Sequence, residues 1–252
     1  ADTNIEIYRY GTKLVEDMWI FGYWGHDSPW WLEHVCVAEY HVLNHEMGRP
    51  SAVPTLYRRD SVMVAIDQAE QYRHNYPPLG RYTLGVWTGE GWAQFGLERW
   101  LPNAMMDMCR GTGMFHFWTD LRRFTPAERK RLSRLGKVLK NYPDCFLNTA
   151  RPIGDPWKGG PYGYACSDGQ RVFLALSNPT FLDQKMELSL DESLGLQQKG
   201  EMAIYRHSLD PAHLTAEDQS WHFGDTLSWY LRPNEVVLME VTPVAEGPAL
   251  PD

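Results

Sequence analysis

The chain has 252 residues, of which 43% are hydrophobic and 22% are charged, as in a globular protein and unlike a disordered or fibrous one. Its net charge of −8 disfavours a nucleic-acid partner, because binding to phosphates requires a basic surface. No run reaches the ~18 apolar residues of a membrane-spanning helix, so no membrane partner is expected. The first residues carry no signal-peptide pattern, and cytoplasmic, periplasmic and secreted locations are all compatible with the sequence.

Cysteines and aromatic residues are the distinctive parts of the composition. The four cysteines are widely spaced and lack a zinc-ligand pattern, so buried thiols are expected, with one or two disulfides as the alternative: Cys36, Cys109, Cys145 and Cys166. The chain holds 11 Trp and 13 Tyr. Flat aromatic side chains can serve as platforms for sugar rings, and the alternative is ordinary packing in a core or an interface.

Short apolar runs alternate with helical patterns through the first half of the chain. Strands are expected at 18–24, 82–87 and 114–118, and helices at 29–47, 60–76, 92–108 and 126–140. The last helix has the clearest start, because Thr125, Pro126 and Glu128 match a capping box with proline in the first turn. The repetition of strand and helix predicts parallel βαβ units. Three such strands cannot close a barrel, so an upstream segment or a companion chain is expected to complete it.

Beyond residue 150 the helical period disappears. Residues 151–163 are dense in Gly and Pro and predict a connector. Short strands are then expected at 171–177, 185–190, 201–206, 225–230 and 235–241. The predicted fold class is α/β plus all-β: a partial (β/α) TIM-type barrel at 1–150 followed by a small antiparallel β-sandwich at 164–245, with a frayed tail at 246–252.

The sequence around the connector resembles a known family. The segments that carry the resemblance are Gly154-Asp155-Pro156, Tyr162-Gly-Tyr-Ala, Leu174-Ala-Leu-Ser-Asn-Pro179 and Pro233-Asn-Glu-Val-Val-Leu-Met-Glu-Val241. Together with the capped helix they resemble the C-terminal half of retaining glycosidases of the α-galactosidase-like clan. This resemblance implies a barrel, a sandwich and a pair of catalytic carboxylates. It also implies that Asp27, after the strand at 18–24, is the acid/base, and that the nucleophile lies upstream of Ala1.

Two carboxylates follow predicted strands and are the catalytic candidates. Glycoside hydrolysis needs one carboxyl group to protonate the leaving oxygen and a second to attack or to activate water. Asp27 follows Trp24 by three residues, and its alternative role is to cap the next helix in an Asp-Ser-Pro turn. Glu90 lies between two glycines after Trp87, and its alternative role is that of an exposed loop acid.

Candidate substrate contacts lie near the same predicted strand ends. Three are possible sugar platforms and three are groups that could bind hydroxyls: Trp24, Trp30, Trp87, Arg59, Asp60 and Arg110. A structural Arg–Asp pair at a helix start is the alternative for Arg59 and Asp60, and a tight turn is the alternative for Arg110. His41 and His45 have the spacing of a metal pair, but without further ligands ordinary histidines are expected. No metal or cofactor is expected, because phosphate-loop and dinucleotide patterns are absent from the sequence.

The sequence therefore predicts part of a glycoside hydrolase that acts on an oligosaccharide or glycoside through two carboxylates. The alternative is a non-catalytic carbohydrate-binding or assembly protein that lacks the nucleophile. A histidine-based metalloprotein is a third and weaker possibility. Nothing in the sequence indicates which sugar or which linkage is recognised.

Overall fold

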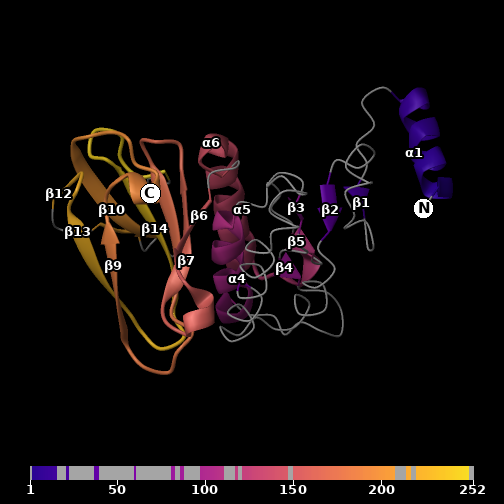
Figure 1. The fold of residues 1–252 in the computed structure, drawn as a ribbon. Coiled ribbons are helices and arrows are strands. Elements are labelled where there is room, and N and C mark those ends of the chain that lie inside the picture. Colours follow the sequence, from indigo (N-terminus) through magenta and orange to yellow (C-terminus); the bar gives the residue numbers. More distant parts are fainter. Residues whose placement is uncertain are drawn as a thin grey trace.

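Figure 1 shows the fold of the protein in a computed structural model. The structure describes residues 2–15, 21–22, 37–39, 60, 81–82, 86–87, 97–110, 117–118, 121–146, 150–207, 214–216 and 220–249.

A large antiparallel sheet forms the centre of the second half. It has seven strands, in the order β11-β10-β14-β8-β7-β6, with β12 also paired to β10. The strands are β6 (Arg151–Gly154), β7 (Tyr162–Ser167), β8 (Val172–Ser177), β10 (Glu201–His207), β11 (Leu214–Ala216), β12 (Trp221–His222) and β14 (Val236–Pro243). A second, two-stranded antiparallel sheet pairs β9 (Gln184–Ser189) with β13 (Thr226–Leu231). Two antiparallel sheets are consistent with the predicted sandwich.

Strand β8 shows how the large sheet separates two cores. Every residue of β8 is buried, because successive side chains point to opposite faces and both faces are covered. Leu174 and Leu176 pack with Leu188 and Trp229 of the two-stranded sheet. Phe173 joins the other core, which lies against the helices. The continuous apolar sequence of β8 is therefore explained by burial on both sides.

Helices cover the second face of the large sheet. They are α4 (Leu97–Cys109), α5 (Pro126–Asn141) and the short α6 (Pro143–Phe146). In Figure 1 these helices stand between the large sheet and the short parallel strands. Helix α4 contacts β7, β8 and β14 on one side and β4 on the other. Met106 and Leu135 are fully buried in this layer with Phe173.

The first half contains short parallel strands. One sheet has the order β1-β2-β3, made of β1 (Phe21–Gly22), β2 (Val37–Glu39) and β3 (Arg81–Tyr82), and all its pairings are parallel. A second sheet pairs β4 (Val86–Trp87) with β5 (Phe117–Trp118), also in parallel. Parallel pairing agrees with the predicted βαβ units. The structure describes too few residues here to show a partial barrel, so the barrel stays a prediction.

Three local predictions differ from the structure. Residues 37–39 form β2, so the helix predicted at 29–47 is wrong there. The run Val35-Cys-Val-Ala38 is short and continuously apolar, and such a run fits a strand as well as a helix. The strand predicted at 82–87 is divided, because β3 pairs with β2 whereas β4 pairs with β5. Residues 151–154, expected within a connector, form the edge strand β6 against β7.

Helix α1 (Asp2–Leu14) begins the described chain and was not predicted. Figure 1 shows it at the far side of the parallel strands from the large sheet. Its apolar side chains Ile7, Tyr10 and Leu14 are exposed. Among the described helices, none combines the length and the apolar character needed to cross a membrane.

Candidate functional site

Two tryptophans are register partners at the ends of the paired strands β4 and β5. The parallel pairing aligns Val86 with Phe117 and Trp87 with Trp118. Trp87 was predicted as a sugar contact, whereas Trp118 was recognised as part of a strand and not as a site residue. Parallel strands end at one edge, and the loops that follow them build the active sites of barrel enzymes. Glu90 follows Trp87 by three residues.

A contact between α4 and α5 brings the first turns of these two helices together. Trp100, in the first turn of α4, donates its indole N–H to Glu128 Oε1 in the first turn of α5, at 3.2 Å. Both helices therefore begin at the same end, and each follows a strand of the β4–β5 pair in the chain. We call this the mouth end: the carboxyl ends of β4 and β5 with the first turns of α4 and α5.

The first turn of α5 is fixed by its capping box. Thr125 Oγ1 accepts a hydrogen bond from the Glu128 backbone N–H at 3.2 Å, and Glu128 Oε2 accepts one from the Thr125 backbone N–H at 2.8 Å. Burial on its own would raise the pKa of Glu128, but the bonds from Thr125 and Trp100 lower it. The predicted capping box is confirmed.

Asp60 and Arg110, both predicted substrate contacts, form a buried ion pair. Arg110 Nε donates to Asp60 Oδ1 at 2.6 Å, and Nη2 donates to Oδ2 at 3.3 Å. Arg110 Nη1 also donates to Asp107 Oδ1 at 3.0 Å, and the hydroxyl of Tyr162 donates to Asp60 Oδ2 at 2.7 Å. Both side chains of the pair are inaccessible to solvent.

The electrostatics of this cluster act on the pKa values of Arg110 and Tyr162. Burial lowers the pKa of Arg110, but the carboxylates of Asp60 and Asp107 outweigh burial and raise it well above its usual value. Burial and the nearby Asp60 raise the pKa of Tyr162, so its phenol remains a donor. Arg110 follows the last residue of α4, so its backbone lies at the other end of this helix from the mouth end. These contacts are those of a structural pair, and a role in substrate binding stays a prediction.

The other predicted site residues lie outside the described residues. They are Asp27, Glu90, Trp24, Trp30 and Arg59. For Trp87 the structure gives the position in β4. The roles assigned to all six stay predictions. His41 and His45 also lie outside the described residues, and within those residues no three metal-ligating side chains gather at one point.

Trp157 is an exposed aromatic that the sequence analysis passed over as part of the connector. It lies in the 3₁₀ helix η5 (Pro156–Lys158), with 55% of its surface exposed. Asp155 caps this turn by accepting a hydrogen bond from the Trp157 N–H at 2.9 Å, and Gly159 ends it at φ 70°. The Gly-Asp-Pro-Trp pattern, in which a capping Asp and a proline precede a tryptophan, is the signal that could have identified a rigid aromatic turn.

The directions of β7 and β8 show at which end of the large sheet Trp157 lies. Tyr142, just after α5, packs against Phe173 near the start of β8. Strand β7 is antiparallel to β8, so β7 begins at the opposite end, and η5 directly precedes it. The start of β8 lies near the last turn of α5, so the start of β7, and Trp157 before it, lie toward the end of the sheet on the side of the first turn of α5.

The described cysteines are buried thiols. Cys109, Cys145 and Cys166 form no disulfide with one another. Burial raises the pKa of the Cys109 and Cys145 thiols, which keeps them protonated. For these three cysteines the structure agrees with the expected buried thiols and not with the alternative of disulfides.

Comparison with solved structures finds glycoside hydrolases. The α-galactosidase I of Mortierella vinacea shares 12% identity over 87% of this chain and 57% of that protein, with a TM-score of 0.55. A GH27 β-L-arabinopyranosidase of Geobacillus stearothermophilus shares 14% identity over 88% of this chain and 48% of that one, with a TM-score of 0.54. An α-amylase of Anoxybacillus shares 13% identity over 94% and 55% of the two chains, with a TM-score of 0.53.

These likenesses concern the fold. At that level the predicted resemblance to α-galactosidase-like structures is confirmed. The chain spans about half the length of the structures that it matches, between 48% and 57% for these three. No protein-family model matches the sequence, and no curated protein matches it significantly.

Proposed function

We propose that this chain is part of a glycoside hydrolase, in which residues 1–150 are the C-terminal portion of a (β/α) barrel and residues 164–245 its sandwich. The proposal is supported by the fold, which resembles an α-galactosidase and an arabinopyranosidase. It is also supported by the order of elements, in which parallel strands are followed by helices that pack on an antiparallel sheet. One fold can host many chemistries, so the proposed hydrolysis is argued from the residues of the mouth end.

The single observation that carries it is the alignment of Trp87 with Trp118 at the ends of parallel strands. Amphipathic aromatic rings at the carboxyl edge of such strands are well placed to stack on the C–H face of a pyranose. A sugar bound there would lie next to the loop that begins after Trp87 and contains Glu90. Asp27 comes five residues after the end of β1, which is a strand of the other parallel sheet.

In the proposed reaction Asp27 is the acid/base. Its carboxylic acid protonates the glycosidic oxygen as the bond between that oxygen and the anomeric carbon breaks, while the second carboxylate attacks the anomeric carbon and forms the covalent intermediate. The carboxylate of Asp27 then takes a proton from water, whose oxygen attacks the anomeric carbon as the bond to the second carboxylate breaks. Glu90 is the candidate for it within this chain, whereas the resemblance implies a nucleophile upstream of Ala1. Oligosaccharides or simple glycosides are the proposed substrates.

The proposal is tested with a panel of 4-nitrophenyl glycosides, including α-galactoside, α-N-acetylgalactosaminide and β-L-arabinopyranoside. Asp27→Asn should lower kcat at least ~100-fold, the lower range for loss of a general acid or base. Glu90→Gln should do the same if Glu90 is the second carboxylate. Asp183→Asn is the matched control, because Asp183 is exposed in the loop before β9. Circular dichroism checks that each variant is folded.

The panel also distinguishes the alternative function. If the wild type, supplied with the upstream segment or companion chain, binds these sugars and hydrolyses none, and Trp87→Ala abolishes the binding, the protein is a carbohydrate-binding one. Wild-type rates in Asp27→Asn would remove Asp27 from the reaction.

A further inference from the structure

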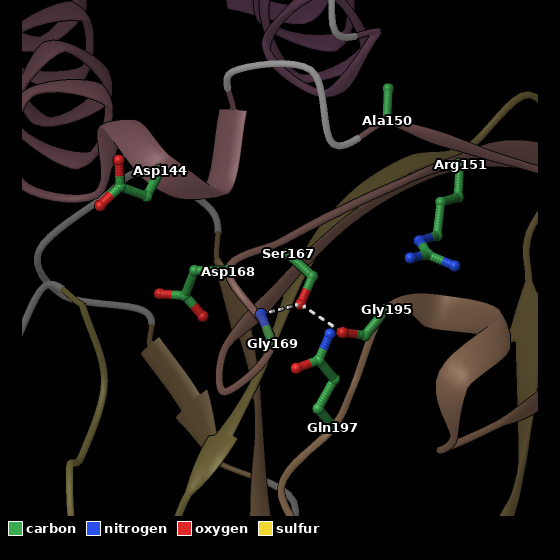
Figure 2. Close-up of a pocket in the computed structure, with 8 residues that line it drawn as sticks. All are labelled: Asp144, Ala150, Arg151, Ser167, Asp168, Gly169, Gly195 and Gln197. Atoms are coloured by element: carbon green, nitrogen blue, oxygen red, sulfur yellow. Dashed lines mark hydrogen bonds between the residues drawn. The ribbon is translucent and has the colours of Figure 1, made fainter.

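A polar cavity of about 590 Å³ lies at the end of α5 away from the mouth end. Figure 2 shows it between α6, the start of β6, the turn from β7 to β8 and the segment that follows the 3₁₀ helix η6 (Glu192–Leu194). The lining residues are Asp144, Ala150, Arg151, Ser167, Asp168, Gly169, Gly195 and Gln197. Neither the proposed reaction nor any predicted site residue involves this cavity.

Hydrogen bonds tie the two loops of the cavity floor together. Ser167 Oγ accepts from the Gly169 N–H at 2.9 Å and donates to the Gly195 carbonyl at 3.1 Å, as Figure 2 shows. The Gln197 N–H donates to the Gly169 carbonyl at 2.8 Å. Gly195 has φ 91°, and a Cβ there would lie 2.8 Å from Ser167 Cβ. The floor is therefore a fixed backbone structure that needs glycine at this position.

The polar side chains separate into two groups across the cavity. Figure 2 shows Asp144 and Asp168 on one side and Arg151 on the other. Asp168 Oδ1 accepts from the N–H groups of Gln170 and Arg171, which orients its carboxylate. Arg151 Nη1 donates to the Glu192 carbonyl at 2.9 Å. The cavity thus presents acceptors on one side and donors on the other.

This arrangement selects the chemical class of a ligand. A simple anion is repelled by the two carboxylates, and a metal ion is disfavoured by the arginine opposite them. An apolar ligand would remove water from charged groups without replacing their hydrogen bonds. Hydroxyl groups both donate and accept, so a polyhydroxylated ring can bond to Asp144 or Asp168 and to Arg151 at once. The volume lies within the ~300–1,000 Å³ usual for small-molecule sites.

We propose that this cavity is a second saccharide-binding site, for a mono- or disaccharide unit, separate from the mouth end. None of its lining residues is aromatic, so it lacks a stacking platform, and we expect dissociation constants of about 1 mM or weaker. Its occupant would be one unit of a longer sugar chain. Binding of that unit would hold the protein bound to the polysaccharide. The preference for a sugar follows from the cavity's own groups and rests on the proposed function only for the choice of test sugars.

The test follows the amide signals of Gly169 and Gly195 in nitrogen–proton correlation NMR spectra during titration with galactose, arabinose and raffinose. These amides belong to the cavity, so binding at the mouth end does not contribute. Both signals should shift on titration. Arg151→Gln and Asp144→Asn should each weaken the affinity at least ~10-fold, which corresponds to the loss of one hydrogen bond to a charged group. Arg232→Gln and Asp183→Asn make the same changes at exposed positions elsewhere and should leave it unchanged.

Each other outcome has a defined meaning. Absence of shifts with all three sugars, or unchanged affinity in both cavity variants, would overturn the proposal. Shifts with glycine betaine but with none of the sugars would identify a zwitterion site instead. Asp27→Asn should keep the shifts, so the cavity can bind sugar even if the proposed hydrolysis fails. The melting temperature of each variant shows that it is folded.

Discussion

Arg110 is held between two buried carboxylates, and its side chain is the cation of that cluster. Arg110→Met should remove about 3–5 kcal/mol from the free energy of unfolding, because Asp60 and Asp107 would remain buried without a cation. Urea unfolding measures the loss. Arg232→Met, at an exposed position, should change stability by less than ~0.5 kcal/mol. A loss below ~1 kcal/mol for Arg110→Met would mean that the cluster admits water.

His207 supplies a second buried polar contact, with a pH dependence. Its Nε2 lies 2.6 Å from Glu240 Oε2, and Arg171 pairs with the other oxygen of Glu240. Burial and the positive charges of Arg134 and Arg171 lower the pKa of His207 to about 4. A neutral ring in the Nε2–H tautomer can donate to the carboxylate of Glu240.

This shift sets the direction of a stability change. Between pH ~6.5 and ~4 the unfolded chain binds a proton at this histidine and the folded chain does not. Stability is complete above pH ~6.5 and should fall as the pH decreases, by at most about 1.4 kcal/mol per unit from this group. Denaturant unfolding at a series of pH values measures the slope. His207→Gln should make it shallower in this window; an equal slope would assign the effect to other groups.

At the scale of elements, the capping box determines where α5 begins. Thr125→Ala should destabilise the protein by about 1 kcal/mol, because the N–H of Glu128 loses its acceptor. Thr125→Ser keeps the oxygen and should recover most of this loss. Ser133→Ala, at an exposed position within α5, is the control for the effect of losing a hydroxyl from the helix. Equal stabilities for the Ala and Ser variants at 125 in chemical unfolding would show that the cap contributes nothing.

The elements that local patterns specify were predicted well. The apolar run of β8 and the capping box of α5 each lie within a few consecutive residues, and both were found at the predicted positions. Residues 37–39 were misjudged, because a short apolar run fits a helix or a strand equally well until its pairing with β1 is known. Strand β6 was missed because its pairing with β7, and not its composition, makes it a strand.

The site was less predictable than the fold, for a physical reason. Arg110 and Asp60 were both recognised as candidates, but they are fifty residues apart and only the folded chain reveals that they neutralise each other. The cavity residues come from four separate segments, and a pattern within any one of them does not indicate a common pocket. Strand register aligns Trp118 with Trp87, and this alignment has no counterpart in sequence spacing.

On the scale of the whole molecule, α5 separates two ends of different character. Its 16 residues span about 24 Å at 1.5 Å per residue. The mouth end has the tryptophans at the ends of β4 and β5, and η5 with its exposed Trp157 lies toward it. The other end has the polar cavity beside α6. Under the two proposals, one end hydrolyses a sugar chain and the other holds it.

Strands β7 and β8 are buried on both faces, and this limits where the chain can be cut to transfer its sheets to another protein. A boundary near residue 150 divides the chain but not the packing, since Tyr164 and Phe173 of the sheet share their core with Met106 and Leu135 of the helices. The sheets are therefore not a portable module. Transferred to another host without α4 and α5, they would present an aromatic face to water, and the new neighbour would have to supply a matching cover.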